Sequence, residues 1–315
     1  MPTSALTLDW DAPALGGPLG ALLPGLRVEV RSCTTSTNSV ILEDARAAPQ
    51  QPAYAPDSAL SMVRRSVEST AFHRGSVDVQ PRLLVAEQQT GGRGRQGRSW
   101  QSAPGASLTF SLALPLQVAD WSGLSLAVGV AVAEALDPCA AAPQRDPRSP
   151  HIALKWPNDL LLVDGAGGGR KLGGILIETL AAGPCRLAVI GIGLNVKALE
   201  INDASSGFAC LQELDVAATA PGALHLIALP LVQALQQFER DGFGAFATRF
   251  ATRDLLRGRP VRTTQPDVPE GIAQGVSAQG ALLVRTDQGI RPVSSGEVSV
   301  RLNMPLEEAL AQRPC

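Results

Sequence analysis

A glycine-rich segment with three arginines carries the strongest chemical signal in the sequence. It reads Ala-Glu-Gln-Gln-Thr-Gly-Gly-Arg-Gly-Arg-Gln-Gly-Arg over residues 86–98, directly after a run of strand-forming residues. Glycines let backbone N–H groups approach an anion closely, and guanidinium groups bind carboxylates or phosphates through paired hydrogen bonds. The segment therefore predicts an anion-binding loop. A solvated turn with incidental arginines is the alternative.

The same glycines also fit a dinucleotide-binding fingerprint. Gly92, Gly94 and Gly97 have G-x-G-x-x-G spacing, and Asp120 lies near the distance expected of a ribose contact. That fingerprint requires a helix directly after the glycines. Here residues 102–105 are typical of a turn and residues 108–114 resume strand character, so we reject this interpretation.

A lysine followed by a proline turn is the second chemical signal. Lys155 ends a strand-like run and precedes Trp-Pro-Asn-Asp, after which a second strand-like run begins. A rigid turn would hold its ammonium where charge develops on a phosphate. Taken alone, the motif is equally typical of an ordinary hairpin.

Two glycine-bearing runs and one polar cluster complete the set. Glycine weakens a strand interior, so the alternation of Gly191 and Gly193 predicts a face left bare for a ligand or another backbone. Strand bends are the alternative. The cluster Thr-Thr-Ser-Thr-Asn at residues 34–38 precedes an apolar stretch, and Ser36 or Thr37 would by default cap a helix there. Capping is compatible with a ligand contact.

Composition excludes several classes of function. The net charge of −2 and pI near 6.0 give no bulk attraction to nucleic acid or anionic membranes. The five cysteines are scattered, which indicates neither a disulfide framework nor a structural metal site. None of the three histidines accompanies a nucleophile motif, and no Walker motif is present. The most apolar stretch, residues 124–136, is shorter than the ~20 residues that cross a bilayer. We therefore expect a cytoplasmic protein.

Patterning divides the chain into one larger and one smaller domain. Residues 1–25 contain four prolines, so we expect an arm without helix there, and residues 45–80 and 138–151 are typical of insertions. Helices are expected at 121–136 and 222–256, the latter with a phenylalanine stripe that belongs to the core. A small barrel is expected at 258–302. Strands are predicted at 83–88, 108–114, 152–155, 160–163, 175–179 and 187–196, with short links that make the last ones an antiparallel meander.

Five of these segments together resemble the biotin protein ligase family: Ser36-Thr37-Asn38, residues 92–97, residues 155–159, residues 171–176 and residues 191–195. The resemblance implies an α+β fold, with a mainly antiparallel sheet flanked by helices in a class II synthetase-like catalytic domain at 26–256. It further implies an SH3-like barrel at 257–303, which leaves a tail at 304–315.

The resemblance also assigns site residues. Lys155, Arg93 and Arg95 are the implied catalytic residues, and no metal ligands are implied. The implied biotin-binding residues are Ser36, Thr37, Asn38, Gln89, Gly92, Arg93, Gly94, Arg95, Lys155, Gly173 and Gly174. The implied adenylate-binding residues are Arg95, Arg98, Trp100, Asn158, Lys155 and Asn195.

The implied reaction joins biotin and ATP, with Mg²⁺, into biotinyl-5′-AMP and transfers biotin to a lysine of the carboxyl carrier protein of acetyl-CoA carboxylase or a related carboxylase. A homodimer is compatible with the family. A proline-rich start argues against a DNA-binding domain, so no DNA or membrane partner is expected. Gln96 departs from the basic residue that many relatives carry, which reduces the loop charge. A lipoate or octanoate ligase or transferase of the same superfold is the alternative function, and a non-catalytic biotin-binding scaffold is a third.

Overall fold

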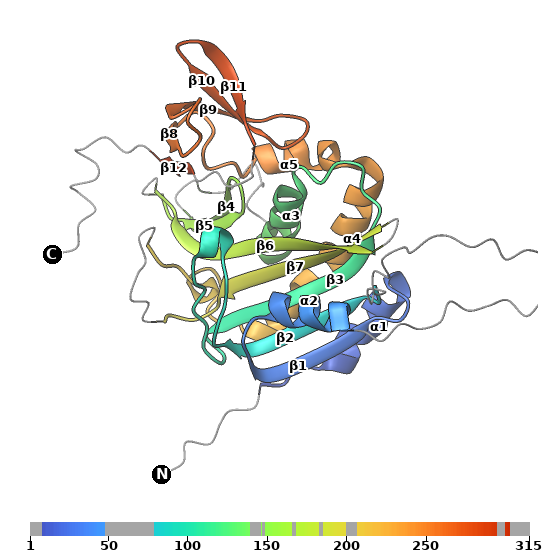
Figure 1. The fold of residues 1–315 in the computed structure, drawn as a ribbon. Helices are drawn as coiled ribbons and strands as arrows, with labels where there is room; N and C mark the ends of the chain where they lie inside the picture. The colour runs from blue at the N-terminus through green and yellow to red at the C-terminus, as the bar shows by residue number, and fades with distance from the viewer. Residues whose placement is uncertain are drawn as a thin grey trace, which may run out of the picture.

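Two β-sheets organise the chain in the computed structural model, which describes residues 8–47, 79–138, 146, 149–165, 168–182, 185–199, 207–294 and 300–302. The larger sheet has the order β1-β2-β3-β7-β6-β5-β4, and the smaller has the order β11-β10-β9-β8-β12 (Figure 1). The strands of the larger sheet are β1 (Arg27–Thr34), β2 (Arg82–Gln89), β3 (Ser107–Leu116), β4 (His151–Lys155), β5 (Asp159–Val163), β6 (Arg170–Ala182) and β7 (Cys185–Asn195).

Strand pairing in the larger sheet is antiparallel except at one edge. β5, β6 and β7 form the predicted antiparallel meander, β4 pairs antiparallel with β5, and β3 pairs antiparallel with both β7 and β2. β1 pairs parallel with β2, and helix α2 (Thr37–Ala47) lies in the crossover between them. Patterning did not predict β1, in which most residues are partly or fully exposed, as is typical of an edge strand.

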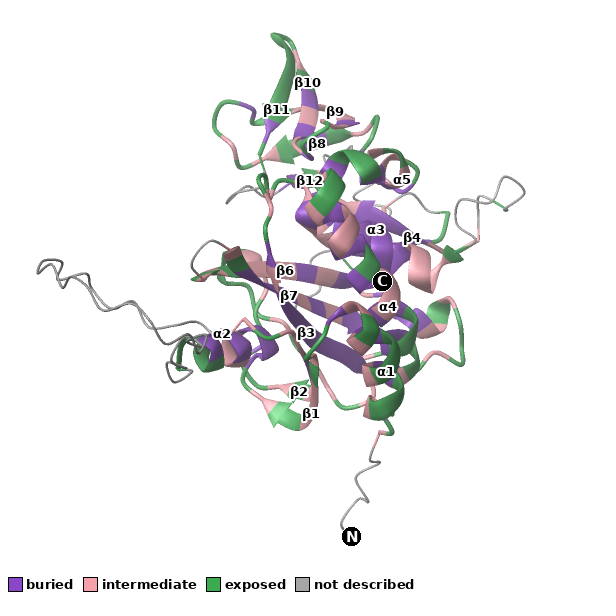
Figure 2. Cartoon of the chain, turned by 90° about the vertical axis from the view of Figure 1, so that its right-hand side faces the viewer, coloured by how far each residue is buried: buried purple, intermediate pink, exposed green. Residues whose placement is uncertain are grey.

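The larger sheet has one apolar face and an opposite face, here called the polar face, on which small and polar residues lie beside an apolar patch of Leu84, Ala113, Leu187 and Val189 that α2 covers. Phe110, Ile192 and Ile175 form one row across β3, β7 and β6, and the adjacent row consists of Thr109, Gly193 and Gly174. Successive strand residues point to opposite faces, so the bulky row faces one way and the small, polar row the other. The apolar face packs against α3 (Leu124–Leu136) and α4 (Ala220–Asp241), whereas α2 lies on the polar face (Figure 2).

The segment expected to be an arm contains a helix, so that prediction was wrong. Helix α1 (Ala12–Leu22) begins with Pro13 in its first turn, where proline costs no hydrogen bond, and tolerates Pro18 inside. Its Leu15 and Leu19 are buried in the main core, next to β1 and α4. Burial of these leucines offsets the poor helix propensity of the prolines.

The long helical candidate is broken at a glycine. Helix α4 runs through Pro230 and ends at Gly242, where φ is +65°, and a 3-10 turn (Phe243–Phe246) and α5 (Ala247–Ala251) follow. The predicted core stripe is confirmed because Phe238, Phe243, Phe246 and Phe250 are all at most 3% exposed. α3 also forms as predicted. Among the described residues, no helix is both long and apolar enough to span a membrane.

The smaller sheet contacts the larger part of the chain near Lys155. Its strands are β8 (Pro260–Thr263), β9 (Glu270–Val276), β10 (Leu282–Thr286), β11 (Gly289–Val293) and β12 (Val300–Leu302), all paired antiparallel. Trp156 Nε1 donates to the carbonyl oxygen of Gly280, in the β9–β10 turn, over 3.0 Å. The antiparallel five-stranded sheet agrees with the expected SH3-like barrel, and the domain boundary near residue 257 stays a prediction.

Both expected insertions fall largely outside the described residues. The first was expected to begin at Ala45, but Ala45 to Ala47 form the end of α2, and the rest of that segment up to residue 78 lies outside the description. In the second, His151 already belongs to β4. The expected tail at 304–315 also lies outside the described part.

Candidate functional site

The glycine and arginine segment forms a hairpin beyond the end of β2. Gly94 N donates to Arg98 O over 2.7 Å, and Trp100 N donates to Gly92 O over 2.9 Å. A Cβ atom on Gly92 would lie 2.4 Å from the carbonyl oxygen of Trp100, so only glycine fits there. A three-residue 3-10 turn at the tip, Arg95–Gly97, is the only helical element of this hairpin, and strand β3 follows it. The dinucleotide fingerprint is therefore rejected by the structure as well.

A buried set of polar side chains, here called the hydroxyl–amide network, joins the Ser36–Asn38 cluster to the sheet. Thr37 N donates to Gln89 Oε1 over 2.7 Å, and Thr37 Oγ1 lies 2.6 Å from Ser111 Oγ. Ser111 Oγ lies 2.6 Å from Asn38 Oδ1 as well. The network consists of Thr37, Asn38, Gln89 and Ser111, and three of them are at most 4% exposed. Ser36 lies beside it as the cap of α2, with Ser39 N donating to its Oγ over 3.5 Å.

Proton accounting fixes the direction of these hydrogen bonds. Asn38 Nδ2 donates to Leu176 O over 3.1 Å and to Glu178 Oε2 over 2.9 Å, which uses both of its N–H bonds. Its Oδ1 can only accept, so Ser111 gives its proton to Asn38. The Thr37 hydroxyl then donates to Ser111 Oγ at 2.6 Å or to Gln89 Oε1 at 3.2 Å. Asn38 therefore shapes the site, and only one Oδ1 lone pair remains for a ligand.

Arg93 is tied to the network through Glu178. Its Nη2 donates to both carboxylate oxygens of Glu178, over 3.1 and 2.8 Å, and the same carboxylate accepts from Asn38. Arg93 is exposed and Glu178 is partly buried. Arg93 is therefore linked through Glu178 to Asn38 and lies next to the hydroxyl–amide network.

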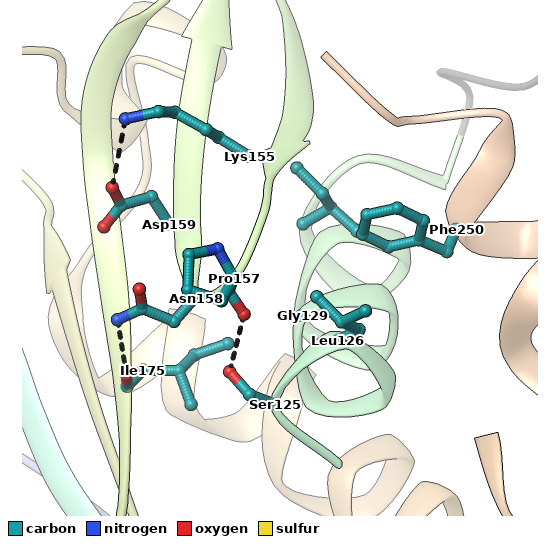
Figure 3. A pocket seen from close by; sticks show the side chains of 10 residues that line it. Ser125, Leu126, Gly129, Lys155, Pro157, Asn158, Asp159, Ile175 and Phe250 are labelled. Atoms are coloured by element: carbon teal, nitrogen blue, oxygen red, sulfur yellow. Dashed lines mark hydrogen bonds and ion pairs between the residues drawn. The ribbon is translucent and has the colours of Figure 1, made fainter. Parts of the chain in front are cut away.

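Lys155 ends β4 and lies opposite Asp159 in a tight hairpin. Lys155 Nζ is 3.8 Å from Asp159 Oδ2, and Figure 3 shows the lysine reaching across the hairpin to this carboxylate. Asn158 braces the turn, because its Nδ2 donates to Ile175 O over 2.8 Å and Ile175 N donates back to Asn158 O. Ser125 on α3 donates to Pro157 O. The pocket behind this hairpin is lined mainly by apolar side chains and is too small for a substrate.

Several cations share the single carboxylate of Asp159. Lys171 Nζ lies 2.7 Å from Asp159 Oδ1 and Lys155 lies on its other oxygen. Burial lowers the pKa of Lys155, with a further decrease from Lys171, Arg98 and Arg301 that Asp159 opposes. Burial also lowers the pKa of Arg95, which Asp159 raises and Arg98 lowers. We call Lys155, Lys171, Arg95 and Arg98, together with Asp159, the cationic cluster. Lys155 and Lys171 carry two positive charges against the one negative charge of Asp159, so this cluster attracts an anion.

The predicted bare glycines divide into two kinds. A Cβ on Gly191 would lie 2.5 Å from Asn38 Oδ1, and a Cβ on Gly193 would lie 2.5 Å from the Trp100 ring. The side chains of Asn38 and Trp100 therefore cover these two glycines, where we had expected a ligand or another backbone. Gly173 faces the apolar side and makes room for Leu194, whereas Gly174 opens toward Lys171 Nζ at 3.7 Å. Only Gly174 of this pair lies on the polar face with the charged residues.

Trp100 and Asn195 differ in how their polar atoms are used. Asn195 is buried, and its Nδ2 donates to the carbonyl oxygens of Lys171 and Ala209, so this amide group holds the backbone together. Trp100 Nε1 is also buried but has no hydrogen-bond partner among the described residues. An orphaned buried donor is costly in a folded protein, so Trp100 is the better candidate for a ligand contact.

Sequence reasoning assigned no role to four residues that the structure brings into the site: Ser111, Glu178, Asp159 and Lys171. The sequence pattern could have indicated Ser111 and Glu178. Ser107, Thr109 and Ser111 alternate with apolar residues along one strand, and Glu178 ends an apolar run at an even spacing from Gly174, which places it on the same strand face. Within the part of the chain that the structure describes, no three His, Cys, Asp or Glu side chains gather.

Comparison with known proteins matches both parts of the chain. The profile of the Biotin/lipoate A/B protein ligase family matches residues 64–195, and that of the Biotin protein ligase C terminal domain matches residues 258–301. The structure of the biotin protein ligase from Aquifex aeolicus in complex with biotin and ATP is similar with a TM-score of 0.61 and 25% identity, over 89% of this chain and 100% of that one.

Two curated relatives are more similar in sequence. The bifunctional ligase/repressor BirA of Salmonella typhimurium is 36% identical over 69% of this chain, which spans only 66% of that relative's length. The biotin--[acetyl-CoA-carboxylase] ligase of Mycobacterium tuberculosis is 35% identical over 70% of this chain and 79% of its own length. The family match at residues 64–195 includes the hairpin and the cationic cluster, and two relatives are at least 35% identical over more than two thirds of this chain, so the chain belongs to the biotin protein ligase family.

Proposed function

We propose that this protein adenylates biotin with MgATP and transfers the biotinyl group to a lysine of a carboxylase carrier protein. The observation that carries the proposal is the placement of two unlike sites on one polar sheet face. A neutral, buried hydroxyl–amide network lies over β3 and β7, and an under-neutralised cationic cluster lies beside Gly174 on β6. A neutral head group suits the first site, and a carboxylate meeting a phosphate suits the second.

In the first step, a biotin carboxylate oxygen attacks the α-phosphorus of MgATP, and diphosphate leaves with the electrons of the broken P–O bond. Lys155, Lys171 and Arg95 would stabilise the negative charge on the phosphoryl oxygens. Mg²⁺ enters with ATP as part of the substrate. Positioning of the two reactants supplies much of the remaining acceleration.

In the second step, the unprotonated amine of a carrier lysine attacks the acyl carbon of biotinyl-5′-AMP. The C–O bond to AMP breaks, AMP leaves with its electrons, and the amine loses a proton to solvent. The hairpin of residues 92–100 would cover the mixed anhydride, with Arg93 on the biotin side and Arg95 and Arg98 on the phosphate side. Exclusion of water by the hairpin protects the intermediate from hydrolysis.

A direct test uses the full chain with biotin, MgATP and the carrier domain of an acetyl-CoA carboxylase. Mass spectrometry should show one biotinyl group on the carrier, and chromatography should show AMP and diphosphate. Omission of ATP is the control. Since the matched family includes lipoate ligases, lipoate and octanoate should be offered in parallel. Preferential transfer of either would replace biotin in the proposal, and no transfer of any of the three would end it.

A further inference from the structure

Glu178 occupies an unusual place for a charged residue. It lies on β6 two residues beyond Leu176 and four beyond Gly174, on the polar face, with Val189 as its register partner on β7. Its side chain is only 27% exposed. A carboxylate in that position needs partners, and it has two: Arg93 from the hairpin and Asn38 from the start of α2.

These two partners come from the two segments that the proposed biotin site requires. Asn38 is held by Ser111 and by the Leu176 carbonyl, so its amide group presents Nδ2 to Glu178 in a fixed direction. Glu178 is therefore oriented by the buried network on one side. On its other side, both of its oxygens accept from a single nitrogen of Arg93. The carboxylate of Glu178 therefore connects the buried hydroxyl–amide network to the exposed hairpin.

We propose that Glu178 is a positioning residue that holds Arg93, and with it the hairpin, over the polar face of the sheet. This inference rests on the proposed function, because its effect is retention of the acyl adenylate. Only Nη2 of Arg93 is used by Glu178, so Nη1 and Nε stay available to a bound substrate. Glu178 is fixed in β6, an interior strand of the sheet, and it anchors the hairpin at the point where the hairpin would cover the intermediate.

Glu178→Gln tests this link with little change in shape. The amide oxygen can still accept from Asn38, but the charge that attracts Arg93 is lost. We expect bound biotinyl-5′-AMP to be released about 5-fold faster, the size typical of a half-exposed charge pair. The Michaelis constant for biotin should rise by a similar factor, with kcat for adenylation nearly unchanged. Glu134→Gln is the matched control, because Glu134 pairs with Arg249 at similar exposure on the apolar side of the sheet.

A double variant shows whether Glu178 acts through Arg93. In an Arg93→Ala background, Glu178→Gln should add less than about 2-fold to the release rate, since the contact is already gone. The inference would be overturned if Glu178→Gln increased the release rate a further 5-fold in the Arg93→Ala background. It would also be overturned if the Glu178→Gln single variant released biotinyl-5′-AMP at the wild-type rate. Glu178→Asp keeps the charge but shortens the reach, so its release rate should lie between those of wild type and Glu178→Gln. If the wild type makes no adenylate at all, the proposed function fails instead.

Discussion

The hydroxyl–amide network and the cationic cluster lie on the same sheet face but are built on opposite principles. In the network the side chains are neutral and hydrogen-bonded to one another, and Thr37, Asn38 and Ser111 are buried. In the cationic cluster the side chains are partly exposed, and the two lysines share one carboxylate. The first is preorganised by internal bonds and offers few open positions, whereas the second is completed only by an anion. Rigid shape recognition and charge stabilisation are thus separated in space.

Removal of a lysine from the cationic cluster should have the largest effect. Lys155→Ala or Lys171→Ala should each slow adenylate formation by about 100-fold or more, because a preorganised charge at developing negative charge is lost. Diphosphate release in a single turnover measures this step. Lys197→Ala is the control, since this lysine is exposed and lies outside the cluster. If the rate of adenylate formation in either lysine variant stayed within about 3-fold of the wild-type rate, the cationic cluster would not be the region that stabilises charge.

Removal of the hydroxyl at the centre of the network should have an intermediate effect with a different signature. Ser111→Ala leaves the buried Asn38 Oδ1 without its hydrogen-bond donor, which should lower the free energy of unfolding by about 1–3 kcal/mol. The Michaelis constant for biotin should rise about 10-fold (from about 1.4 kcal/mol of lost binding) while that for ATP stays constant.

The control for this variant is Ser107→Ala on the same strand. Ser107 is also buried, but its Oγ accepts from Ala103 N and is not part of the network. Its replacement should affect stability without changing the Michaelis constant for biotin. An equal rise for biotin and ATP in Ser111→Ala would contradict the separation of the two regions.

The pH dependence of adenylation gives the smallest and most local test. Burial lowers the pKa of Lys155, so the rate should fall as pH rises through that lowered pKa and the ammonium is lost. Asp159 opposes the decrease, so Asp159→Asn should move this alkaline limb to lower pH. Asp164→Asn, whose partner is Arg170, is the control. A limb that stays in place would show that Lys155 is not the titrating group.

The same shift has a defined sign for stability. The folded protein releases the Lys155 proton more readily than the unfolded chain does. The contribution of this lysine to stability therefore increases as pH rises from its lowered pKa toward the ordinary value near 10.5. Thermal unfolding across this range compares Lys155→Met with wild type, and the variant should lose that pH-dependent gain.

Local patterns predicted much of the fold but failed where packing overrides them. The meander of β5 to β7, the α3 helix and the phenylalanine stripe follow from hydrophobic periodicity and short links. Helix α1 forms in spite of Pro18 because Leu15 and Leu19 are buried by distant elements. The sequence pattern did not predict strand β1, because most residues of this edge strand are partly or fully exposed and need not alternate between apolar and polar. Neither cause can be read from local sequence.

The candidate site was predicted unevenly for a similar reason. Motif segments identified Arg93, Arg95 and Lys155, whose types and spacing indicate anion chemistry. They did not indicate that Arg93 pairs with Glu178, that Gly173 faces the core, or that Asn195 holds backbone carbonyls. Each of these depends on which strand residue faces which side and on partners 14 or more positions away. Register decides such contacts.

The sequence by itself determined the chemical inventory: a glycine hairpin with arginines, a lysine at a strand end, a polar cluster before a helix and an apolar alternation that requires a sheet. The tertiary structure alone decided which of these groups share a surface. Ser111, Glu178 and Asp159 gain their roles only when β3, β6 and the hairpins come together. The physical reason is that side-chain identity is local, whereas burial, charge balance and hydrogen-bond partners are set by neighbours far apart in the chain.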